Sequence, residues 1–133
     1  MPQDRESGAR ASEYGLENAT ALIKHLRGKN RKRGSNEFDL DGERVTIHSS
    51  QYREGRPQSV GVTLVCLVTV KSVLGAFQDN NGSYQIMSLP AGEFKKASRL
   101  TASHGPAKDR VVIVKRSVFE AKGKRIAVVP AKQ

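Results

Sequence analysis

The chain has a single cysteine, Cys66, among 133 residues, which excludes an intrachain disulfide and any zinc cluster of several thiolates. Cys66 lies in the apolar run VTLVCLV, so we expect a buried and inert thiol. Tryptophan is absent, and the few Tyr and Phe residues do not alternate with basic residues as in surfaces that stack single-stranded nucleic acid. No apolar run approaches the roughly 20 residues that cross a bilayer, and the opening MPQDRESGAR lacks the layout of a signal peptide. We therefore expect a soluble, cytoplasmic protein with no membrane partner.

Acidic residues are also scarce. The chain holds 13 Asp and Glu against 23 Lys and Arg, a formal net charge of +10 and a sequence pI near 10.1. This excess favours polyanionic partners, with nucleic acid ahead of an anionic membrane. The glycine patterns of Walker and dinucleotide-binding loops are missing, and the lone Gly75 in VLGAF more simply marks close packing or a bulge within a strand.

The chain divides by texture into a short polar start and one domain. Residues 1–11 are polar and are expected to be flexible, and residues 12–133 are expected to form a single nucleic-acid-binding domain. An amphipathic helix is predicted over residues 12–27, because apolar residues recur there at the spacing of one helix face and Ser12 is a good N-cap. The apolar members of that face are Leu16, Ala19, Ile23 and Leu26.

The rest of the chain predicts a hairpin-dominated mixed sheet with short helices late in the chain. The stretch 60–78 resembles a buried strand, with a short helix around residues 64–70 as an open alternative. The loop DNNG at 79–82 predicts a hairpin between VLGAFQ and SYQIMSL. Helices are expected from Pro90 and from Ser117 to Lys122, and strands at VVIV and IAVV. The fold class is therefore α+β, a single mixed domain.

Basic residues gather first where the predicted helix ends. Gly28 is placed to stop the helix, and the stretch KHLRGKNRKRG holds no acid. Two interpretations remain open: a solvated cationic helix terminus, which the helix dipole favours, or an arm that contacts phosphates. The basic residues of this run are Lys24, Arg27, Lys29, Arg31, Lys32 and Arg33.

More basic residues follow in two places. Arg53 and Arg56 lie in the polar loop QYREGRPQS, and Lys115 and Arg116 follow the strand VVIV. If these residues and the run 24–33 lie on one side of the molecule, they form a cradle of the size of a duplex. If they lie on opposite sides, the charge serves mainly solubility and non-specific binding.

The stretch EFDLDGERVTIHSS, residues 37–50, predicts a β-hairpin. Asp41-Gly42 is a preferred sequence for a two-residue type I′ turn. That turn sets Leu40 opposite Glu43, Asp39 opposite Arg44, Phe38 opposite Val45 and Glu37 opposite Thr46. Because faces alternate along each strand, Phe38, Leu40, Val45 and Ile47 form a core face, and Glu37, Asp39, Arg44, Thr46 and His48 lie together on the face that points away from it.

The polar face of this hairpin predicts a partial metal site. Diagonal neighbours across a strand pair lie about 7–8 Å apart, so Glu37 and His48 could approach a common metal. Asp39 and His48 are two pairing steps apart, on the order of 13 Å along the strands, and would need a bend to meet.

A helix, an acid on a strand, a hairpin turn and a second strand ending VTIHSS together resemble the core of the PD-(D/E)XK, or restriction-endonuclease-like, nucleases. On that pattern Glu37 or Asp39 matches the first acid, Thr46 the second acid and His48 the lysine. In the family, the carboxylates hold a divalent metal, and the lysine orients or activates the attacking water. The resemblance implies catalytic roles for Glu37, Asp39 and His48.

The resemblance also implies a divalent metal, Mg²⁺ or Mn²⁺, held by Glu37 and Asp39. Thr46 brings no charge to such a site, and the imidazole of His48 suits softer metals than Mg²⁺, so Mn²⁺ should support any cleavage better than Mg²⁺. Glu13 or Glu17 on the first helix could supply the missing carboxylate, and Glu17 completes the expected ligand set. A neutral imidazole can accept a proton from water, which would make the rate rise near pH 6.5.

Two functions follow from these patterns. The first is a metal-dependent endonuclease, or the remnant of one, acting on duplex DNA. The second is a basic domain that binds DNA or RNA and cuts nothing, in which His48 is an ordinary strand residue and the two acids flank a turn. The sequence leaves monomer and homodimer both open.

Overall fold

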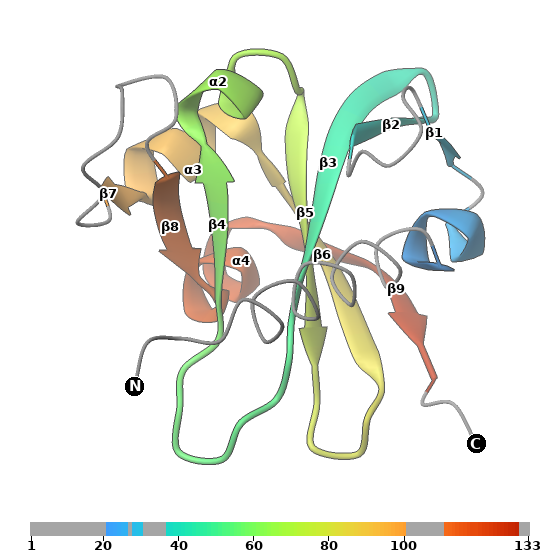
Figure 1. Cartoon of the computed structure of the whole chain (residues 1–133), viewed down its shortest axis with the longest axis vertical. Coiled ribbons are helices and arrows are strands. Elements are labelled where there is room, and N and C mark those ends of the chain that lie inside the picture. Colours follow the sequence, from blue (N-terminus) through green and yellow to red (C-terminus); the bar gives the residue numbers. More distant parts are fainter. Residues whose placement is uncertain (1–20, 27, 31–36, 101–110, 131–133) are drawn as a thin grey trace, which may run out of the picture.

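The computed structural model describes residues 21–26, 28–30, 37–100 and 111–130, which form two sheets and short helices (Figure 1). The six-stranded sheet has the order β1 (Lys29–Asn30), β2 (Glu37–Leu40), β3 (Glu43–Ser50), β5 (Ser72–Gln78), β6 (Tyr84–Pro90) and β9 (Lys124–Val129). The three-stranded sheet has the order β4 (Ser59–Thr63), β8 (Val111–Lys115) and β7 (Arg99–Leu100). The helices are α2 (Leu64–Leu67), α3 (Ala91–Ala97) and α4 (Arg116–Lys122). The α+β class is confirmed.

Most of the expected elements are present in the described ranges. Residues 21–25 are helical, as the predicted first helix requires, whereas its earlier part and the expected flexible segment 1–11 lie outside the described residues. Strands β5 and β6 flank the DNNG loop, and α3 starts directly after Pro90. Helix α4 begins one residue before Ser117, and Lys115 is its N-cap without a side-chain hydrogen bond. None of the described helices is long and apolar enough to cross a membrane.

The hairpin of β2 and β3 has the register that its turn predicts. All four expected pairs form, from Leu40 opposite Glu43 to Glu37 opposite Thr46. Asp41 and Gly42 have φ values of 53 and 83 degrees, and a type I′ turn needs positive φ at both central residues. The local sequence therefore determines which side chains share a face.

The connection from β3 to β5 is a crossover, because these two strands lie side by side and run parallel. The stretch 60–78, expected as one strand with a helix as the alternative, divides into β4, α2 and β5. The hydroxyl of Thr63 accepts a hydrogen bond from the backbone N–H of Cys66 at 3.3 Å and so caps α2. The chain thus leaves the large sheet at Ser50, builds an edge of the small sheet, and returns (Figure 1).

Each face of the large sheet carries a buried cluster. The first cluster contains Leu22 and Ile23 of the helical segment, with Phe38, Val45 and Ile47 of the hairpin. Leu40 is half-buried and packs against it. This confirms the predicted core face of the hairpin.

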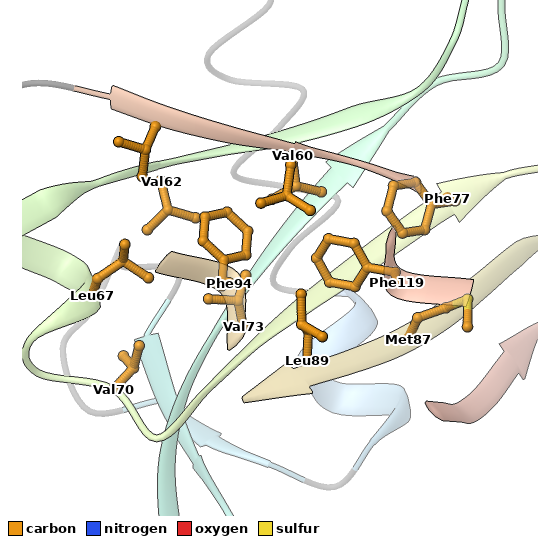
Figure 2. Packing of buried hydrophobic residues seen from close by; sticks show 12 residues of the cluster. Val60, Val62, Leu67, Val70, Val73, Phe77, Met87, Leu89, Phe94 and Phe119 are labelled. Carbon is orange, nitrogen blue, oxygen red and sulfur yellow. The ribbon is translucent and has the colours of Figure 1, made fainter. Parts of the chain in front are cut away.

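The second cluster covers the opposite face, and it corrects one expectation. It joins β5 and β6 to the small sheet and to α3 and α4, and Figure 2 shows its aromatic centre. Phe119 stacks edge-on against Phe77 and Phe94, with ring centroids 5.2 and 6.1 Å away. The polar face of the hairpin was expected to point away from the core, but Thr46 is only 1% exposed because a second layer packs over that face.

Gly75 is a point of close approach on β5, as expected. A Cβ atom there would come within 2.6 Å of the Phe77 ring and 3.2 Å of Val60. Gly75 is also opposite His48 in the parallel pair β3 and β5. The absent side chain leaves room for the second cluster next to the histidine.

Candidate functional site

A pocket of about 450 Å³ opens between the hairpin, β4 and α2. Its lining combines polar side chains from the hairpin and α2 with apolar side chains from the small sheet. The lining residues are Glu37, Thr46, His48, Gly61, Val62, Thr63, Val65, Cys66, Thr69 and Val111. Two of the three predicted catalytic residues, Glu37 and His48, therefore share one pocket.

Glu37, at the start of β2, is held by side chains from the α2 region. The Thr69 hydroxyl donates a hydrogen bond of 2.8 Å to Oε1 of Glu37, and the Cys66 thiol lies 3.6 Å from the same oxygen and donates to it. The Thr69 hydroxyl also lies 2.8 Å from the carbonyl oxygen of Cys66. The carboxylate therefore has a fixed orientation toward α2.

Cys66 differs from the expected buried residue, because it is half-buried and lines the pocket. Burial raises the pKa of its thiol to about 11, and the negative charge of Glu37 adds to that rise. A hydrogen bond with Thr46 works in the opposite direction. A thiol with this pKa stays protonated at neutral pH. Its lack of reactivity stays a prediction.

His48 lines the same pocket, where it is half-buried next to Thr46. The Thr46 hydroxyl and Nε2 of His48 form a hydrogen bond of 3.1 Å. Burial lowers the pKa of His48 to about 4, so the imidazole is neutral throughout the physiological range. The expected titration near pH 6.5 does not fit this lowered pKa, because the second layer partly covers the side chain.

Asp39 is placed apart from the pocket. It lies two residues along β2 from Glu37 and is paired in register with Arg44 on one side and Lys29 on the other. It is not among the residues that line the pocket. The structure thus brings Glu37 and His48 together without Asp39, as the pairing steps predicted.

The donor set of the pocket does not fit Mg²⁺. Within the described ranges, no three His, Cys, Asp or Glu side chains come together in a way that could hold a metal ion. Mg²⁺ prefers several oxygen ligands, whereas the pocket offers one carboxylate, a neutral imidazole and a protonated thiol. Glu13 and Glu17, the other carboxylates considered, lie outside the described residues.

The predicted nucleic-acid contacts fall at different places. Lys24 is exposed on the helical segment, Arg53 and Arg56 are exposed in the loop after β3, and Lys115 is exposed at the end of β8. Lys29 belongs to β1, at the edge of the large sheet. The remaining residues of the basic run, Arg27, Arg31, Lys32 and Arg33, lie outside the described residues.

Arg116 is engaged inside the molecule. Its guanidinium donates to Gln58 Oε1 at 2.7 Å and to Asp79 Oδ1 at 2.9 Å, and it lies 5.5 Å from the centre of the Phe77 ring. Sequence reasoning missed Gln58, Asp79 and the pocket residues Cys66 and Thr69. The one local signal for Cys66 and Thr69 was Thr63, which lies three residues before Cys66 and caps α2.

Neither the models of known protein families nor the curated proteins contain a match to this chain. The likeness to PD-(D/E)XK nucleases consequently stays a prediction from the residues of the hairpin.

Proposed function

We propose that this protein binds nucleic acid, with duplex DNA as its main partner, through exposed Lys and Arg side chains. The observation that carries the proposal is the charge balance of the surface. In the described residues, exposed basic side chains outnumber exposed acidic ones: Lys24, Arg53, Arg56, Lys71, Lys95, Lys96, Arg99, Lys115, Lys122, Lys124 and Arg125 against Asp41, Glu43, Glu54 and Glu120. A surface of this kind attracts the phosphate backbone and releases its counterions.

The side chains of the pocket fit a protein that binds nucleic acid better than one that cuts it with Mg²⁺. Its single carboxylate accepts hydrogen bonds from Thr69 and Cys66, and its histidine is neutral. These features suit a structural or degenerate site on the face of the sheet. The charge of +10 needs no catalytic site to explain it.

Replacing Arg31, Lys32 and Arg33 together with alanine is expected to weaken binding to all duplex sequences alike. Each neutralised phosphate contributes about 0.9 to the slope of log K against log salt concentration, so the slope should become shallower by up to about that amount for every phosphate that the variant no longer binds. Fluorescence anisotropy with a labelled DNA duplex over a series of KCl concentrations measures both quantities.

The matched control replaces the three exposed basic residues Lys95, Lys96 and Arg99 with alanine, which removes the same formal charge elsewhere. An equal effect in both triple variants would mean that net charge alone governs binding. RNA duplex and single-stranded DNA of equal length test the choice of partner. Absence of binding to every one of these ligands at low salt would contradict the proposed function.

A metal-dependent endonuclease is the second candidate, and the meeting of Glu37 and His48 in one pocket favours it. On this proposal, supercoiled plasmid is nicked faster in Mn²⁺ than in Mg²⁺, because Mn²⁺ accepts a nitrogen donor more readily. Further carboxylates would have to come from outside the described residues.

Glu37→Gln and His48→Ala should each lower any Mn²⁺-dependent nicking by about tenfold or more, since both remove a polar group from the pocket. The rate should not rise through pH 6.5, because His48 is already neutral there. Asp41→Asn, in the exposed turn, is the control and should nick like the unmodified protein. Nicking that survives both pocket variants would rule out this pocket as the site.

A further inference from the structure

A network of hydrogen bonds fixes the loop between β3 and β4. The side-chain amide of Gln58 donates to the carbonyl oxygens of Ser50 at 3.0 Å and of Gln78 at 2.7 Å. Its Oε1 accepts from Arg116 at 2.7 Å, and its backbone oxygen accepts from the N–H of Arg116 at 2.9 Å. One glutamine thus joins the ends of β3 and β5 to the start of α4.

The network continues into the hairpin between β5 and β6. Arg116 donates to Asp79 at 2.9 Å, and Gln85 donates to the other carboxylate oxygen of Asp79 at 3.0 Å. Tyr52, near the other end of the loop, donates its backbone N–H to the side chain of Gln78 at 3.1 Å. Figure 1 shows this loop and the β5–β6 hairpin at the same end of the molecule.

The position of Arg116 carries a desolvation penalty, because its side chain is only 23% exposed. A paired charge of low exposure adds little net stability compared with apolar residues of similar volume. A satisfied polar network instead specifies one geometry. The geometry specified here is that of the loop, since Gln58 directly follows the loop and Arg116 links Gln58 to Asp79.

The loop itself contributes nothing to the core. Residues 51–57 are all exposed, so burial does not explain why the chain holds them in place. A tight turn lies at the tip, where the N–H of Arg56 donates to the carbonyl oxygen of Arg53 at 3.1 Å and Gly55 takes a positive φ of 74 degrees. Residues at the two ends of such a turn have Cα atoms less than about 7 Å apart.

We propose that the loop 51–57 is a preformed finger that binds the DNA backbone, with Arg53 and Arg56 on neighbouring phosphates, and that Gln58, Asp79 and Arg116 are its positioning residues. This inference rests on the proposed function. The turn brings the Cα atoms of Arg53 and Arg56 to within about 7 Å of each other, and the planar guanidinium group matches the geometry of phosphate oxygens. Holding the loop before binding removes an ordering cost that a mobile loop would add.

The neighbouring strand adds charge at the same place. Lys115 is opposite Ser59 in the pair β4 and β8, directly after the loop, and its side chain is exposed. Arg53, Arg56 and Lys115 therefore lie at one end of the two sheets. Arg116, the residue after Lys115, supports this surface as a positioning residue and does not itself contact phosphate.

The experiment measures DNA binding of the full chain by fluorescence anisotropy over a series of KCl concentrations. It compares two test variants and one control variant. The double variant Arg53→Ala/Arg56→Ala should make the salt slope shallower by up to about 1.8, because two phosphates are no longer neutralised. Gln58→Leu, which keeps the side-chain bulk and both arginines, should weaken binding about three- to tenfold at a nearly unchanged slope, because only the ordering of the loop is removed. Faster amide hydrogen exchange in residues 51–57 of Gln58→Leu provides an independent measure of that disordering.

The matched control is Lys95→Ala/Lys96→Ala on α3. This helix follows the end of β6 that pairs with Ser72, whereas the loop contacts Gln78 at the other end of β5. The salt slope of this control should stay steeper than that of the Arg53 and Arg56 double variant. Equal slopes in the two double variants, or unchanged binding without Arg53 and Arg56, would overturn the finger while leaving DNA binding itself intact. If the unmodified protein binds no DNA, the proposed function fails first. The arginine pair is exposed, so its result decides the inference even if Gln58→Leu does not fold.

Discussion

Replacing Phe119 with alanine is expected to lower the free energy of unfolding by about 3–5 kcal/mol. Phe119 is fully buried, and it is the ring that contacts both Phe77 and Phe94 in the second cluster (Figure 2). The substitution removes apolar surface and leaves a cavity where α4 meets the large sheet. Urea unfolding followed by circular dichroism measures the change.

Val128→Ala is the matched control, because Val128 is an apolar residue that is 43% exposed on β9. Its removal should change stability by no more than about 0.5 kcal/mol. A decrease below about 1 kcal/mol in the Phe119 variant would contradict the packing of α4 described above.

Acid is expected to destabilise the protein through His48. The pKa of this imidazole is 6.5 in an ordinary environment and is lowered by burial to about 4 in the folded chain. The folded state therefore binds fewer protons, and acid favours unfolding. The contribution of His48 to the free energy of unfolding amounts to about 3 kcal/mol and is fully present above pH 6.5. It is lost as the pH falls toward 4.

The measurement is the free energy of unfolding at several pH values between 7 and 4, compared between the unmodified protein and His48→Gln. The variant cannot titrate at this position, so its stability should fall less over that interval. His25→Gln removes an exposed histidine and controls for the removal of an imidazole in general. Parallel pH curves for the unmodified protein and His48→Gln would contradict the lowered pKa of His48.

The β2–β3 hairpin illustrates what local sequence can determine. Asp41-Gly42 permits the positive φ values of its turn, and that turn fixes the register. Register and the alternation of faces then place Glu37 and His48 on one side and Phe38 and Ile47 on the other. The candidate pair of the pocket could accordingly be predicted, and so could the separation of Asp39 from it.

The surroundings of that pair could not be predicted. The pattern of the hairpin alone shows one apolar and one polar face, and a polar face is normally solvated. Here β4 and α2 cover it, because the chain makes a crossover between β3 and β5 through the second sheet. Burial of Thr46, the lowered pKa of His48 and the hydrogen bond from Cys66 to Glu37 all follow from that crossover.

Charge shows the same division between sequence and tertiary structure. The composition by itself determined an excess of 23 basic over 13 acidic residues, because net charge does not depend on the fold. The polyanionic partner that this charge favours stays a prediction. Only the tertiary structure decided the surroundings of Arg53, Arg56 and Arg116. Arg116 meets Gln58 and Asp79, which lie 58 and 37 positions away in the chain, so it is held inside while Arg53 and Arg56 face solvent. Interactions over such distances along the chain leave no periodic signal in the sequence, since they depend on how whole elements pack.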